Sequence, residues 1–252
     1  MRYTPRPKGC LLARQCNYAE YSCASRHPLG RGVYRIRSNH HLPFPPMRNV
    51  AILLFNEIEV LDFAGPFEVF GVTGRQSKQM RFAEPPFHVF TVAERGPVYA
   101  RNSLIITPTY TLNDHPKPDL ILIPGGGNYL SDGTPAGSRR EMHNPAILSW
   151  VNRHADGAEL VLSVCTGSLI LASAGLLDGL SATTHFLALQ NMAEQFPQIT
   201  LCPDDRWVDN GKVITSAGIS AGIDMSLHVV GRLLGADVAR ETAQYMQYDY
   251  WL

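Results

Sequence analysis

Apolar residues after residue 47 fall into short continuous runs that alternate with longer stretches of helical period. Four runs are continuous enough to predict strands buried on both faces. They are Val50–Phe55, Phe87–Val92, Leu120–Ile123 and Leu160–Val164. An Asn210-Gly211 pair separates Arg206–Val208 from Lys212–Thr215, and such a pair is typical of a hairpin turn.

Helical stretches lie between these strands. They are Gly65–Gly71, Ala146–Ala155, Thr166–Ala174, Phe186–Gln195, Ile223–Leu234 and Val238–Tyr248. We expect Pro66 to be the first residue of its helix, Gly235 to end the fifth helix, and Asp237 to cap the sixth. Strands and helices in alternation predict one domain, a three-layer, flavodoxin-like α/β sandwich with a mainly parallel sheet.

The first 46 residues have a different composition. They contain eight basic residues and one acidic residue, Glu20, and six of the 18 prolines. Their apolar residues follow no helical or strand period, and they hold neither a secretory signal nor the short Cys-x₂₋₄-Cys pair of zinc sites. We therefore predict that residues 1–46 are a non-structural basic extension, preceding a start codon at Met47, and that the functional domain covers residues 47–252.

The whole chain has 22 basic and 22 acidic residues, so the +7 charge of the extension leaves −7 on residues 47–252. An acidic domain does not suggest a nucleic-acid partner. The chain contains no apolar run of the roughly 18 residues that span a bilayer, which excludes an integral membrane protein. Cys165 and Cys202 give the domain no disulfide framework, and we therefore expect a cytoplasmic protein.

Cys165 follows a predicted strand and precedes a predicted helix, in the string Ser163-Val164-Cys165-Thr166-Gly167. Small residues on both sides of the cysteine are typical of a nucleophile elbow, which points the side chain out above the sheet. The positive end of the following helix favours a thiolate there. A buried structural cysteine is the alternative, and the pattern alone favours neither.

Two other strand ends carry unusual residues. Pro124 is followed by three glycines, which allow the backbone to approach a ligand, and the amides of Gly126 and Thr166 could form an oxyanion pocket. An ordinary turn is the alternative. Asp62 ends another apolar stretch, where it could act as a helix cap. If it instead faces a thiolate in a poorly solvated pocket, its pKa would be raised and it could serve as an acid or base.

His185 follows Cys165 by 20 residues. It is either the histidine partner of a thiol nucleophile or a structural hydrogen-bonding residue near the site, and we weigh these two roles equally.

Six short motifs follow one another along the domain, and each occurs once. They are Leu61-Asp62-Phe63-Ala64-Gly65-Pro66 with Glu68, Ile123-Pro124-Gly125-Gly126, Ser163-Val164-Cys165-Thr166-Gly167, Ala174-Gly175-Leu176-Leu177-Asp178-Gly179, Ala182-Thr183-Thr184-His185, and Ser216-Ala217-Gly218-Ile219-Ser220-Ala221-Gly222-Ile223-Asp224. In these motifs the chain resembles the ThiJ/PfpI superfamily, which has the class I glutamine-amidotransferase-like fold. Its isonitrile hydratase branch and the sensing domain of AraC-type regulators are the most similar members.

The resemblance implies that Cys165 is the nucleophile and Asp62 its acidic partner. The protease-like branch has a histidine directly after the nucleophile, whereas this chain has Thr166, which speaks against peptidase activity. The resemblance also implies that dimers are common, and we expect a homodimer.

We therefore expect an isonitrile hydratase-like enzyme that converts an isonitrile and water to an N-substituted formamide by covalent thiol catalysis, without a metal or an organic cofactor. The expected site comprises catalytic Cys165, Asp62 and Thr166, with Gly126, Gly127 and His185 around the oxyanion or substrate. The alternatives are a small-molecule sensing domain that lacks a DNA-binding region, and a glyoxalase or thiol-stress protein of the same superfamily.

Overall fold

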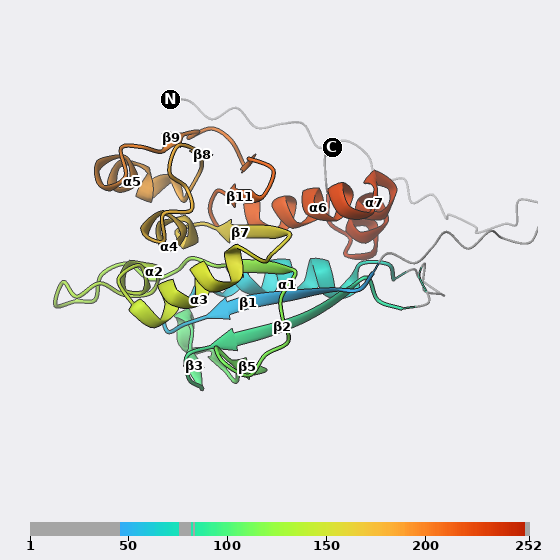
Figure 1. The fold of residues 1–252 in the computed structure, drawn as a ribbon, viewed down its shortest axis with the longest axis horizontal. Coiled ribbons are helices and arrows are strands. Elements are labelled where there is room, and N and C mark those ends of the chain that lie inside the picture. Colours follow the sequence, from blue (N-terminus) through green and yellow to red (C-terminus); the bar gives the residue numbers. More distant parts are fainter. Residues whose placement is uncertain (1–45, 76–81, 83, 250–252) are drawn as a thin grey trace, which may run out of the picture. The chain divides into compact units, whose positions relative to one another are not determined.

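The structure is a computed structural model that describes residues 46–75, 82 and 84–249. Within these residues the main sheet has seven strands (Figure 1). Their order is β10 (Trp207–Asp209), β11 (Val213–Ser216), β7 (Leu160–Val164), β6 (Leu120–Ile123), β1 (Arg48–Leu54), β2 (Phe87–Ala93) and β5 (Tyr110–Thr111). β10 runs antiparallel to β11, while the other neighbouring pairs of this sheet are parallel.

In the described part of the chain, two short ladders lie outside the main sheet. β3 (Val98–Tyr99) pairs antiparallel with β4 (Ile105–Ile106), and β8 (Ser181–Ala182) pairs parallel with β9 (Thr200–Leu201).

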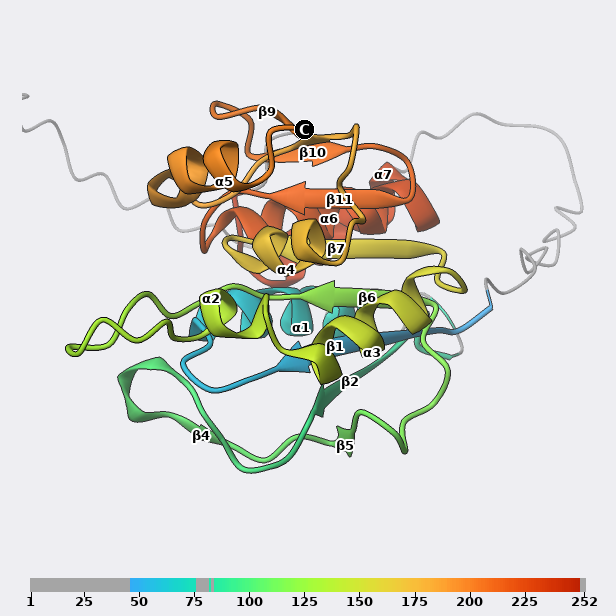
Figure 2. The same cartoon turned by 60° about the vertical axis from the view of Figure 1, so that its left-hand side comes forward.

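Helices cover both faces of the main sheet (Figure 2). One layer contains α1 (Val60–Val72), α6 (Ala221–Leu234) and α7 (Ala236–Tyr245), and the other contains α2 (Ser138–Glu141), α3 (Pro145–Ala155) and α4 (Gly167–Ser173). The chain also forms α5 (Leu189–Gln195) and the 3₁₀ helices η1 (Arg101–Ser103) and η2 (Phe186–Ala188). None of the described helices is both long enough and apolar enough to cross a membrane. The prediction of a three-layer α/β fold with a mainly parallel sheet is confirmed.

The central strands are buried on both faces. Every residue of β6 and β7 is buried, as are Val50–Leu54 of β1. Parallel strands covered by helices on both sides need apolar residues at every position rather than at alternate ones. This requirement explains the continuous apolar runs in the sequence.

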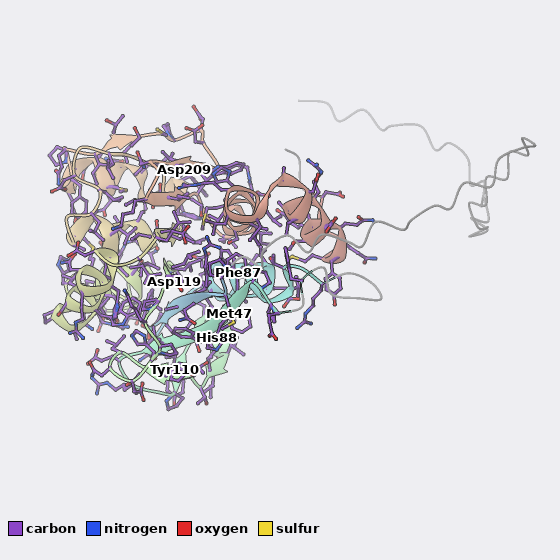
Figure 3. The ribbon with its side chains drawn as sticks, turned by 45° about the vertical axis from the view of Figure 1, so that its right-hand side comes forward. Met47, Phe87, His88, Tyr110, Asp119 and Asp209 are labelled. Atoms are coloured by element: carbon purple, nitrogen blue, oxygen red, sulfur yellow. The ribbon has the colours of Figure 1, made fainter. Side chains whose placement is uncertain are left out.

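The direction of strand order reverses between β1 and β6, because the chain leaves β1 for β2 on one side and returns to β6 on the other. Ligand sites of open α/β sheets lie at such a switch point, beyond the carboxyl ends of the strands. The amino ends lie at the opposite edge of the sheet, where Met47, Phe87 and His88 gather (Figure 3). At that edge the N–H of Asn49 donates to Asp119 Oδ2 over 2.8 Å.

The start of α1 differs from its prediction. The helix begins at Val60 with Glu59 as its N-cap, so Pro66 lies inside the helix rather than at its first position. Pro66 has no N–H for the carbonyl of Asp62 in the preceding turn. The helix nevertheless continues through Pro66, because Phe63 before it and Phe70 after it are buried in the core.

Of the two predictions for the junction of α6 and α7, the one for Gly235 is confirmed and the one for Asp237 is not. Gly235 ends α6 at a φ of 100°, and its N–H donates to the carbonyl of Gly231 over 2.9 Å. The prediction that Asp237 caps α7 is wrong, because Gly235 is also the N-cap and Asp237 lies in the first helical turn.

Candidate active site

Cys165 occupies the turn between β7 and α4 with a φ of 57°. A left-handed conformation strains a residue that has a side chain, and it persists only where the surroundings hold it. Here the Cys165 N–H lies 3.1 Å from the carbonyl oxygens of both Ser216 and Ala217. Its own carbonyl accepts from Thr184 Oγ1 at 3.0 Å and from Ser168 Oγ at 3.1 Å. The turn has the geometry of a nucleophile elbow, as the sequence predicts.

Asp62 lies in the first turn of α1 and is fully buried. Its Oδ2 accepts the N–H of Gly125 over 3.0 Å, while Oδ1 is buried and has no conventional hydrogen-bond partner among the described residues. Burial raises the pKa of Asp62 to about 7, although the Gly125 N–H and the Cys165 thiol partly offset the shift. The cap role left open for Asp62 belongs to Glu59, and the expected rise in its pKa is confirmed.

The Cys165 thiol faces this carboxyl group and is only 6 % exposed. Burial raises the pKa of the thiol and the charge of Asp62 raises it further, although the backbone N–H groups of Thr166 and Ile219 act in the opposite direction. The N–H at the helix end acts in the expected direction, but desolvation and the adjacent carboxylate outweigh it, so the pKa of the thiol is raised rather than lowered. The resting thiol keeps its proton, with Asp62 positioned beside it to accept it.

The end of β6 has no room for a side chain at Gly125. A Cβ atom at Gly125 would lie 2.5 Å from the nitrogen of Thr166 and 2.9 Å from Oδ2 of Asp62. Real Cβ atoms do not approach other atoms so closely. The missing side chain thus allows the ends of β6 and β7 and the start of α1 to meet.

The hydroxyl of Thr166 is buried and already engaged. Thr166 Oγ1 accepts the N–H of Gly126 over 3.1 Å, and Ser138 Oγ lies 2.7 Å away. The same Ser138 oxygen lies 3.0 Å from the carbonyl oxygen of Gly126. Contact of either the Gly126 amide or the Thr166 hydroxyl with a substrate would therefore require this network to open.

His185 is the N-cap of η2, and its Nδ1 accepts the N–H of Leu187 over 3.3 Å. Partial burial, followed by the charge of Arg139, lowers the pKa of His185, so the ring is neutral with its hydrogen on Nε2. The charged group that acts on the Cys165 thiol is Asp62 and not His185. Of the two roles left open, the structural hydrogen-bonding role near the site fits this geometry.

A cavity of about 530 Å³ joins these groups. It is lined by Glu59, Arg101, Gly126, Gly127, Asn128, Arg139, Cys165, Thr166, His185, Leu187 and Ile219. All the predicted site residues except Asp62 therefore contribute to one wall. Asp62 does not line the cavity, because it is fully buried, and its carboxyl group faces the thiol of Cys165.

Several lining residues, among them Arg139 and Ile219, were not predicted from the sequence. Arg139 and its neighbour Ser138 lie on the short helix α2, whose sequence has no helical period to reveal it. Ile219 belongs to one of the quoted motifs, but its φ of 52°, which is rare for a β-branched residue, is visible only in the structure. A strained residue at this position aims its N–H at the thiol.

A second cavity of about 540 Å³ lies at the carboxyl ends of β1 and β2. Its charged residues include Arg140, which forms ion pairs with Glu57 and Glu141 over 2.7 Å. It contains no thiol. The buried thiol and carboxyl group make the cavity at Cys165 the candidate active site.

The sequence of this chain matches a known protein family and several individual proteins. The family described as DJ-1/PfpI matches residues 48–232. Isonitrile hydratase of Pseudomonas putida is 33 % identical over 201 residues, which are 79 % of this chain and 78 % of that protein. The HTH-type transcriptional regulator CdhR of Pseudomonas aeruginosa is 31 % identical over 158 residues, 63 % of this chain but only 44 % of the regulator.

Solved structures show the same fold. A ThiJ/PfpI family protein from Pseudomonas syringae superposes with a TM-score of 0.69 at 25 % identity, covering 92 % of this chain and 85 % of that one. DJ-1beta of Drosophila melanogaster superposes with a TM-score of 0.64 at 20 % identity, covering 81 % of this chain and 100 % of that one.

Proposed function

This chain belongs to the DJ-1/PfpI family, as its motifs predicted, and on that premise we propose that it hydrates an isonitrile, R–N≡C, to the formamide R–NH–CHO. The observation that carries the proposal is the buried pair of Cys165 and Asp62 at the cavity wall. Hydration of an isonitrile places a nucleophile and a proton on the same terminal carbon. A protonated thiol beside a carboxylate of pKa about 7 supplies both from one place.

In the first step, Cys165 Sγ attacks the terminal carbon of the isonitrile. Asp62 takes the thiol proton as the sulfur attacks and returns it to the same carbon. The product is a thioformimidate, R–N=CH–S, bound to Cys165, and the carboxylate of Asp62 is regenerated. A covalent intermediate of this kind divides one difficult addition into two easier ones.

In the second step, water adds to the carbon of the thioformimidate. Asp62 accepts a proton from the water and passes it to the substrate nitrogen. The C–S bond then breaks, the sulfur recovers a proton from the new hydroxyl group, and the formamide leaves. The net reaction is R–N≡C plus H₂O giving R–NH–CHO, with Cys165 and Asp62 restored.

Preorganised N–H groups assist this route. The amides of Thr166 and Ile219 point at the sulfur, where they stabilise negative charge as the thiol loses its proton. The hydrogen bond from Gly125 holds the carboxyl group of Asp62 in position. Thr166 holds the Gly126 turn through its hydroxyl, so we assign it a positioning role in addition to its amide.

Turnover of an alkyl isonitrile tests the proposal, with formamide measured by NMR. We expect Cys165→Ala and Asp62→Asn each to lower the rate by at least about 10³-fold, as loss of a nucleophile or its base does in other enzymes. Cys202→Ala is the matched control, because Cys202 is the other free cysteine described and does not line the cavity. If the unsubstituted protein leaves a panel of isonitriles unchanged, the proposal is wrong.

The similarity to transcriptional regulators supports a second candidate, a domain that binds a small molecule without converting it. Mass spectrometry of the intact protein after exposure to an isonitrile separates the two: a mass increase that disappears as formamide forms supports catalysis, whereas release of unchanged ligand supports sensing. Consumption of methylglyoxal would instead support glyoxalase chemistry. The cytoplasmic location and the homodimer stay predictions.

A further inference from the structure

The cavity at Cys165 contains one cation without an acidic partner among the described residues, namely Arg139. The other arginine of the wall, Arg101, is paired, since its Nε lies 3.3 Å from Glu59 Oε2. His185 is neutral because its pKa is lowered. The charged side chains of the cavity wall therefore leave a single uncompensated positive charge.

The guanidinium of Arg139 has its donors available. Its central carbon lies 5.6 Å from the centre of the Tyr129 ring, which is a cation–π contact and occupies none of the N–H donors in a hydrogen bond. The N–H groups in the plane of the guanidinium remain for a hydrogen-bonding partner, and they match the two oxygens of a carboxylate. The charge of Arg139 also lowers the pKa of His185, so Arg139 acts on another group of the same cavity.

Apolar side chains complete the wall. Leu187 is 72 % exposed and Ile219 is 38 % exposed, although both line the cavity. A volume of about 530 Å³ is in the range of sites that hold ligands much larger than a methyl or ethyl isonitrile. The space thus suits a substrate with an apolar body between the thiol and the cation.

We propose that the substrate is an isonitrile that carries a carboxylate, which Arg139 binds while the apolar body lies against Leu187 and Ile219 and the isocyano group reaches Cys165. This inference rests on the proposed function, because it specifies the substrate of the same site. One unpaired positive charge matches a monoanion better than a doubly charged phosphate.

Kinetics with 4-isocyanobutanoate and its methyl ester test the inference. For the unsubstituted protein we expect kcat/KM to be about 10- to 100-fold higher for the carboxylate, the range of a charge-assisted hydrogen-bonded pair. Arg139→Gln should lower the ratio of the two kcat/KM values toward one, and Arg139→Lys should retain part of it. Arg153→Gln, an exposed arginine of α3 outside the cavity, should leave the ratio unchanged. Equal kcat/KM values for the two compounds with the unsubstituted protein would overturn the inference.

Binding of the corresponding formamides separates this inference from the proposed function. If no isonitrile is converted, the proposed function fails, and calorimetry with 4-formamidobutanoate and its methyl ester still tests the role of Arg139. Tighter binding of the carboxylate, by about tenfold or more and lost in Arg139→Gln, supports the inference. Equal affinity for both compounds, or binding of neither, contradicts it.

Discussion

The buried carboxyl group of Asp62 links the chemistry of the site to the stability of the fold. Its pKa rises from 3.8 to about 7 on folding, so between these pH values the folded protein binds a proton that the unfolded chain has released. The free energy of unfolding should therefore fall as pH rises through this window. By pH 8 the loss is on the order of 4 kcal/mol, from the size of the shift.

Asp62→Asn should remove this pH-dependent loss of unfolding free energy, because asparagine does not ionise. Its side-chain oxygen can still accept the Gly125 N–H. We expect the substituted protein to be more stable than the parent at pH 8, with the difference shrinking toward pH 4. Urea unfolding at pH 4, 6 and 8 measures it. Asp237→Asn is the control, because Asp237 is 73 % exposed at its side chain and should change stability little at any of these pH values. A stability difference between Asp62→Asn and the parent that does not depend on pH would contradict this account.

The same pKa predicts the pH dependence of catalysis. In the proposed mechanism ionised Asp62 accepts the thiol proton, so kcat/KM for a neutral isonitrile should rise with pH and level off above about 7. At pH 5 it should be roughly 1 % of the plateau, since that fraction of Asp62 is ionised there. Initial rates between pH 5 and 9 measure the profile. Rates that instead fell with pH would show that protonated Asp62 is the active form.

The identities of these residues were predictable because Cys165 and Asp62 are chemically distinctive side chains next to apolar runs. The protonation state of the Cys165 thiol could not be predicted from the sequence. It depends on how deeply α1 and the segment around Ile219 bury the sulfur, and both lie far from Cys165 in the sequence. The proposed role of Arg139 was hidden for the same reason, since nothing in the sequence around α2 indicates that this helix packs against α4, which follows Cys165.

Among the elements, the long buried strands and the longer helices were predictable, and the short ladders were not. β6 and β7 have the predicted bounds because a strand buried on both faces is a nearly continuous run of apolar residues, interrupted here only by the buried Ser163. β3, β4, β8 and β9 have two residues each, too few for any period. The start of α1 was misplaced because Pro66, usually a first-turn residue, lies in the helix interior.

The glycine at the end of β6 gives a prediction at the level of elements. Gly125→Ala should push the carboxyl end of β6 away from α4 and α1, because its Cβ would overlap Thr166 and Asp62. We expect a loss of several kcal/mol or insoluble protein, in the range of severe core overpacking. Gly71→Ala in α1 is the matched control. No atom lies within 4 Å of its added Cβ, and alanine in a helix should raise stability by about 0.5–1 kcal/mol. Thermal unfolding measures both, and a mild effect of Gly125→Ala would contradict the proposed contact.

At the scale of the whole molecule, the sequence divides at Met47 into a basic segment and an acidic domain. The family match begins at residue 48, while residues 1–45 lie outside the described part of the chain, so the boundary stays a prediction. A chain beginning at Met47 should have the melting temperature of the full chain within about 2 °C, since a non-structural segment contributes no buried contacts. Its isonitrile turnover should also be unchanged. A clear drop in either measurement would show that residues 1–46 contribute to the fold or the site.

The reversal of strand order between β1 and β6 has a consequence for how the protein acquires activity. Asp62 follows β1, Gly125 follows β6 and Cys165 follows β7, so their meeting requires parallel pairing across all three strands. Such non-local pairing is the slow part of folding. A partly folded chain in which β6 has not joined its neighbours keeps the thiol and the carboxyl group apart. During refolding, the proposed activity would therefore return only with the central sheet, and until then the thiol would remain open to alkylating reagents.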